Sequence, residues 1–160
     1  MTDAPGDGTR GARAAHERPL ALVLTQVADA GPLAAACALA GVQVDAAPTP
    51  VGALAVCRRT GPGEPEQAAE AISRLLQNTP VLLVVRRDGA LVATRWAGGS
   101  ATTEVAPGLL LDGAPRELEG LLLGTLDVAA LPGTVSSVGL GRWRATRMLA
   151  AAARAARGAR

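Results

Sequence analysis

The sequence predicts an α+β domain with a ferredoxin-like, split βαβ sheet, one added hairpin strand and extra C-terminal helices. This prediction depends on the order of the local patterns, which is strand, helix, strand, strand, helix, strand. It also depends on length, because 160 residues suit a single domain. Two wholly apolar strand-length runs and an uncharged first helix suit an alternative, an open α/β sheet with helices on both faces.

The first half of the chain supplies four elements of this order. Residues 20–25 form a continuous apolar run, which predicts a central strand covered on both faces. A helix is expected over residues 32–40, because a proline stands in its first turn and a glycine directly follows it. Two short strands at 42–44 and 53–58 are expected to form a hairpin across the turn-rich segment between them.

The clearest amphipathic helix begins at residue 65. Its expected buried stripe consists of Ala68, Ala69, Ile72, Leu75 and Leu76. Glu66, Glu70 and Arg74 are expected to face outward, and the last two can form an i,i+4 ion pair. The Asn-Thr-Pro sequence that follows ends this helix.

Strand signals return after this helix. An Asp-Gly pair at 88–89 separates the apolar run 81–85 from residues 90–96, which is a strong hairpin signal. A weaker strand is expected at 102–105. The pattern thus adds a hairpin to the sheet.

Two more helices are expected in the C-terminal part. One begins at Pro115, buries Leu118, Leu121 and Leu122, and extends to the Pro-Gly pair at 132–133. Residues 133–141 are expected to be a loop, and the last helix covers residues 142–157.

The predicted organisation has three parts. Residues 1–18 lack any periodicity and are expected to be a disordered tail. Residues 19–132 form the single domain, and residues 133–160 form a linker and an Arg-rich helix. Apolar runs are far shorter than the roughly 20 residues that a membrane span needs, so no span is predicted.

The composition is most unusual in what it lacks. Phe, Tyr and Lys are absent, and the 16 basic residues are all arginines, which indicates a bacterial genome of high GC content. Arginine richness by itself therefore carries no functional argument. The distribution of charge is more informative, because the last 19 residues hold six arginines and no acid. Residues 88–141 hold six acids and two arginines.

The two cysteines, Cys37 and Cys57, are too few for a zinc site or a disulfide framework. Reduced, buried thiols in a cytoplasmic protein are the expected state. We expect no cofactor, no metal and no catalytic residue.

Arg58 and Arg59 are the candidate anion-binding residues, because they precede a Gly-rich turn that leads into a helix. Their charge would also favour a thiolate on Cys57. However, strand alternation sends the two arginines to opposite faces, and the only imidazole, His16, lies in the expected tail. A solvated turn is the simpler interpretation.

The last helix is the second candidate, as an interaction element. Its candidate residues are Trp143, Arg147, Met148, Leu149, Arg154 and Arg157. They could contact nucleic-acid phosphates with Trp143 stacked on a base, lie on an anionic membrane, or pack an apolar Ala/Met/Leu stripe on the domain itself or on a second copy. Packing on protein is the preferred interpretation and the membrane is ranked last.

The leading functional hypothesis is a small cytoplasmic, non-catalytic protein-interaction or regulatory domain that associates with itself. An accessory nucleic-acid-binding protein that uses the Arg-rich helix is the first alternative. A small-ligand or anion-binding domain, or an enzyme, that uses Arg58, Arg59 and Cys57 is the second.

Overall fold

The computed structural model describes residues 11, 13 and 18–159. Its strands are β1 (Leu20–Leu24), β2 (Val44–Ala47), β3 (Leu54–Cys57), β4 (Val81–Arg87), β5 (Ala90–Ala97), β6 (Ser100–Val105) and β7 (Val135–Ser136). Its helices are α2 (Ala30–Leu39), α3 (Glu64–Leu75), α4 (Pro107–Leu111), α5 (Arg116–Leu123), α6 (Arg142–Gly158) and the 3-10 turn η1 (Val128–Ala130). Apart from residues 11, 13 and 18, the predicted disordered tail lies outside the described residues.

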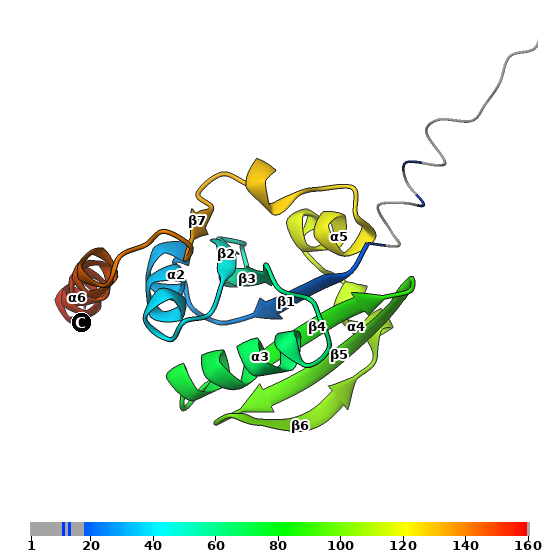
Figure 1. Cartoon of the computed structure of the whole chain (residues 1–160), viewed down its shortest axis with the longest axis horizontal. Coiled ribbons are helices and arrows are strands. Elements are labelled where there is room, and N and C mark those ends of the chain that lie inside the picture. The colour runs from blue at the N-terminus through cyan, green and yellow to red at the C-terminus, as the bar shows by residue number, and fades with distance from the viewer. Residues whose placement is uncertain (1–10, 12, 14–17, 160) are drawn as a thin grey trace, which may run out of the picture.

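Within the described residues, all seven strands form one open antiparallel sheet in the order β6-β5-β4-β1-β3-β2-β7 (Figure 1). β1 is the central strand and pairs with β3 and β4, so that Leu22 lies opposite both Val56 and Val84. Ala21, Leu22 and Val23 have no exposed surface. The predicted central strand, covered on both faces, is confirmed.

Helices cover both faces of the sheet. On one face, Ala34 of α2 and Ile72 of α3 belong to a core cluster with Val23 of β1. On the other face, Leu122 of α5 belongs to a second cluster with Val84 of β4. Helices on both faces were expected for the open α/β alternative, but every strand pair is antiparallel, so the fold is α+β.

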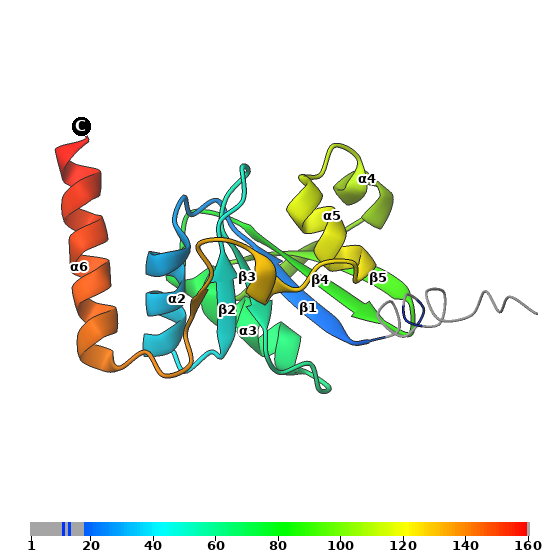
Figure 2. The same cartoon turned by 90° about the horizontal axis from the view of Figure 1, so that it is seen from above.

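α2 lies between the sheet and α6 (Figure 2). This position explains why its sequence has no charged residue, since both of its sides face apolar neighbours. Gly31 lets α6 approach closely, because a Cβ there would lie only 3.2 Å from Cε of Met148. Residues 133–160, predicted as a linker and a helix, thus contain β7 on β2 and α6 on α2.

The β4–β5 hairpin is confirmed. Asp88 and Gly89 have φ angles of 51° and 75°, and two consecutive positive φ values are what a two-residue type I′ turn requires. Gly98 and Gly99 repeat this arrangement, with φ angles of 56° and 89°, between β5 and β6.

Several predicted boundaries were wrong. The helix predicted from residue 115 to the Pro-Gly pair ends with α5, because Gly124 has a φ of 76° and terminates it. The predicted loop at 133–141 contains β7, whose Ser136 lies opposite Asp45. β2 lies later in the chain than the predicted 42–44, and α4 was not predicted.

Two side chains of α3 also differ from their predicted environment, although the Glu70–Arg74 ion pair is confirmed at 2.6 Å. Leu75 is 45% exposed instead of buried. Glu66 faces inward in part, and its Oε2 is buried. At about 100° per residue, both positions lie roughly 90° from the centre of the buried stripe, on opposite margins, so periodicity assigns them poorly.

Candidate functional site

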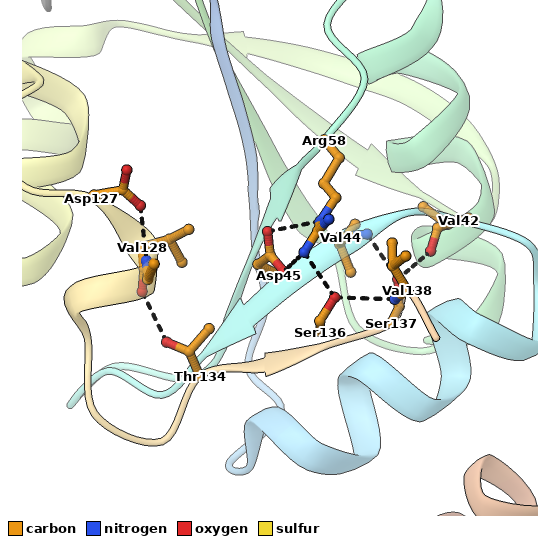
Figure 3. Close-up of polar contacts among 11 residues, drawn as sticks. Val42, Val44, Asp45, Arg58, Asp127, Val128, Thr134, Ser136, Ser137 and Val138 are labelled. Atoms are coloured by element: carbon orange, nitrogen blue, oxygen red, sulfur yellow. Dashed lines mark hydrogen bonds and ion pairs between the residues drawn. The ribbon is translucent and has the colours of Figure 1, made fainter. Parts of the chain in front are cut away.

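The two candidate anion-binding arginines point to different neighbours. Arg58 directly follows β3, and its Nε and Nη2 donate to the carboxylate of Asp45 at 3.0 and 2.8 Å (Figure 3). Nη2 also donates to Oγ of Ser136 at 3.1 Å. The hydrogen bonds to Asp45 raise the pKa of Arg58. This guanidinium therefore links β3 to β2 and β7.

Hydroxyl groups complete this polar connection between β2 and β7 (Figure 3). Oγ of Ser137 accepts from the backbone N–H of Val44 at 2.8 Å and donates to the carbonyl of Val42 at 2.7 Å. Thr134 donates to the carbonyl of Val128 at 2.9 Å. These contacts position the chain directly before α6.

Arg59 lies in a separate environment. Its Nη1 is 3.7 Å from Oε1 of Glu64, and both residues line a cavity of about 240 Å³ together with Cys57. Arg58 does not line this cavity. The structure therefore does not bring the two guanidinium groups to one place. Within the cavity, the charge of Arg59 is opposed by the carboxylate of Glu64.

Cys37 and Cys57 are buried, free thiols, as expected. Burial raises the pKa of each thiol to about 12, with smaller contributions from Cys57 on Cys37 and from Glu66 on Cys57. Each is therefore protonated at neutral pH. A protonated thiol is a weak nucleophile.

The candidate residues of α6 lie on two sides of the helix. Ala145 is buried, and Met148, Leu149 and Ala152 are half-buried on the side that faces α2. The opposite side carries Trp143, Arg147, Ala150, Arg154 and Arg157. These five residues, spaced four, three, four and three apart, form one continuous stripe. We call it the outer stripe of α6.

The outer stripe is strongly exposed and positive. Trp143 is 85% exposed. Nε of Arg154 and Nε of Arg157 donate to carbonyls of their own helix at 3.3 Å, and no contact is found for their terminal nitrogens among the described residues. α6 contains five arginines and no acid. None of the five forms an ion pair within the described part of the chain.

Charge is separated along the molecule. α6 lies at one end, whereas α4 and α5 lie toward the other (Figure 2). The six acids of residues 88–141 are in or near β5, β6, α4 and α5. α6 is therefore a positive end, and residues 104–127, with five acids and one arginine, form a net negative segment away from it.

Comparisons of the chain with protein-family models, with curated proteins and with solved structures find no match. Among the described residues, no three His, Cys, Asp or Glu side chains gather as a metal ion would require. No helix in residues 18–159 is both long and apolar enough to cross a bilayer. Of the candidate sites, the outer stripe is the one whose residues lie together on one exposed surface, whereas Arg58 and Arg59 are separated and the cysteines are buried.

Sequence reasoning missed two polar features. Asp45 was not predicted as the partner of Arg58, although Asp45 directly follows the first predicted strand of the hairpin and Arg58 ends the second. Glu66 and Trp96 were not connected, yet both line a groove between α3 and β5. The sequence offered only a weak signal for this groove. Glu66 lies at the edge of the apolar stripe of its helix, and Trp96 lies in a predicted strand.

Proposed function

We propose that the protein is a non-catalytic binding protein whose outer stripe of α6 binds the phosphate backbone of nucleic acid. One observation carries this proposal. A Trp that is 85% exposed lies on the same face as Arg147, Arg154 and Arg157, with no acid in the helix. Arginines supply affinity for phosphates, and the exposed indole supplies a stacking surface for an unpaired base.

The position of the arginines within α6 supports a role toward a partner. Arg142 and Arg144 lie in the first turn, where the helix dipole is positive and where acids are favoured. No acid or side-chain cap compensates for them there. Their charge opposes the stability of α6 by itself, and an anionic partner gives it a favourable role.

The chemistry of the outer stripe favours a polyanion over another protein. Trp and Arg are enriched in protein interfaces too, but such an interface also buries an apolar core, and this stripe supplies only Trp143 and Ala150 toward one. Arg147 and Arg157 are ten residues apart, about 15 Å along the helix axis, which spans several phosphates of a strand. A lipid surface is the weaker candidate, because Trp143 is the only bulky apolar residue on the stripe.

Fluorescence of Trp143 tests this proposal. We expect oligothymidylate to quench the tryptophan fluorescence of the wild-type protein saturably, and NaCl to reverse this quenching. The Trp143→Ala variant should show no such quenching. Trp143→Ala should not disturb the packing of Leu149 against α2, because Leu149 lies on the opposite side of α6. Anionic vesicles and a polyglutamate peptide of equal charge serve as comparisons. If polyglutamate binds as tightly as oligothymidylate, or if only the vesicles bind, nucleic acid is not the partner and the proposal is wrong.

Self-association is a second candidate, and the charge separation favours it. The basic outer stripe of one copy is complementary to acids such as Glu117 and Glu119 on α5 of another. This contact joins unlike surfaces, so it extends head to tail unless it closes into a ring. Sedimentation at low salt should then show species larger than a monomer, and Glu117→Gln with Glu119→Gln should abolish them.

For the fold, we propose that β1 to β4 with α2 and α3 form a ferredoxin-like unit. Their chain order is βαββαβ, their sheet order is β4-β1-β3-β2, and both helices belong to the core cluster on one face. β5 and β6 extend this unit on one edge and β7 on the other. The free thiols of Cys37 and Cys57 support the cytoplasm as the proposed compartment.

A further inference from the structure

A groove of about 200 Å³ lies between α3 and β5, and no residue of α6 lines it. Its floor is formed by Leu83 and Val85 of β4 beside Thr94 and Val92 of β5, which are paired in register. Val92 is 48% exposed, so this floor is open to solvent. The groove is therefore apolar in its middle and accessible from outside.

Two polar atoms of residues that line this groove are buried without a partner. Oε2 of Glu66 and Nε1 of Trp96 have no hydrogen bond among the described residues. Buried polar atoms in proteins are nearly always paired. One atom is an acceptor and the other is a donor, and they belong to two residues that line the same cavity, so a ligand reaches them where the side-chain atoms that cover them move aside.

The unpaired atoms define the chemistry of a ligand. A carboxylate oxygen takes an N–H donor, and an indole N–H takes a carbonyl oxygen. A carboxamide provides both groups in one planar unit. The apolar floor takes a compact apolar body, and the volume far exceeds the ~30 Å³ that one water occupies.

The charged groups around the groove disfavour an anionic ligand. Glu66 would repel a carboxylate at the position of the unpaired acceptor. Arg87 also lines the groove, and its Nη2 donates to the carbonyl of Gly61 at 3.4 Å. A neutral ligand avoids the repulsion from Glu66 and does not depend on Arg87.

We infer that the α3–β5 groove is a binding site for a small neutral carboxamide with an apolar body. Its N–H donates to Glu66, its carbonyl accepts from Trp96, and its body covers Val85 and Val92. This site is independent of the outer stripe of α6, so either proposal stands without the other.

NMR titration with benzamide tests this site. The indole N–H signal of Trp96, identified by its absence in Trp96→Phe, should shift saturably with an affinity on the order of millimolar. Benzoate, which lacks the N–H donor, should bind at least about fivefold more weakly. The signal of Trp143 should not move with either compound.

Matched variants complete the experiment. Glu66→Leu, which removes the acceptor, and Trp96→Phe, which removes the donor, should each weaken benzamide binding roughly fivefold or more, read from the backbone signal of Val92. Glu104→Leu, on the exposed side of β6 and outside the groove, should leave binding unchanged. Equal binding of benzoate and benzamide, no shift of the Trp96 signal up to the solubility limit, or full binding by folded Glu66→Leu would overturn the inference.

Discussion

The guanidinium of Arg86 donates a 2.6 Å hydrogen bond to the backbone carbonyl of Leu122 in the last turn of α5. It also donates to the carbonyls of Leu121 at 3.4 Å and Arg18 at 3.1 Å. Arg86 is only 3% exposed, and burial lowers the pKa of its guanidinium. Since the last carbonyls of a helix lack helical partners, Arg86 caps α5 and ties it to β4.

Replacement of Arg86 by Met should therefore destabilise the protein by roughly 2–3 kcal/mol, because buried carbonyls lose their donors. Urea unfolding at neutral pH measures the change. Arg95→Met is the control, since Arg95 is exposed on β5, and it should cost less than about 0.5 kcal/mol. Equal costs for the two variants would show that the cap contributes nothing.

Adjacent residues of α6 should respond oppositely to a new charge. Leu149→Asp places a carboxylate against α2, which offers no polar partner, and should cost roughly 1–3 kcal/mol. Ala150→Asp changes the exposed outer stripe and should cost less than about 0.5 kcal/mol. Thermal melting compares the two proteins. Indistinguishable melting temperatures would contradict the assigned orientation of α6.

Stability should fall at alkaline pH because of the two cysteines. The folded thiols have a pKa of about 12 instead of 9.0, so unfolded chains release protons first as pH rises above 9. The free energy of unfolding therefore falls from about pH 9 toward 12, by at most about 1.4 kcal/mol per pH unit for each thiol. The chain contains no Tyr or Lys, whose side chains would otherwise titrate in this range.

Urea unfolding under reducing conditions between pH 8 and 11 measures this decline. The Cys37→Ala, Cys57→Ala double variant is the control. The comparison uses the slope of the free energy of unfolding against pH, not its absolute value. Its profile should be flatter than that of the wild type. Parallel profiles would rule out the thiols as the cause.

Sequence patterns predicted those elements whose signal is local. The apolar run at β1 identified a central strand because no polar residue interrupts it. The Asp88-Gly89 turn identified a hairpin because few residues adopt consecutive positive φ angles. The two-residue strand β7 has no local pattern, and it forms through its contacts with β2.

A candidate site could be predicted from the sequence when its residues lie close together in the chain. The outer stripe is visible in the sequence, because helical spacing alone separates Arg147 from Leu149. That Arg58 is held by Asp45 depends on the register of β2 and β3, which spacing does not specify. The groove between Glu66 and Trp96 depends on how α3 lies over β4 and β5.

The most direct test of the proposed function is the salt dependence of binding to a fluorescent oligothymidylate. The logarithm of the association constant should fall linearly with the logarithm of the salt concentration. Changing Arg147, Arg154 and Arg157 to Gln should weaken binding and reduce the magnitude of that slope by roughly 2. The same change at Arg87, Arg95 and Arg116, away from α6, should leave slope and affinity nearly unaltered. An unchanged slope in the α6 variant, or an equal loss in the control variant, would contradict the account.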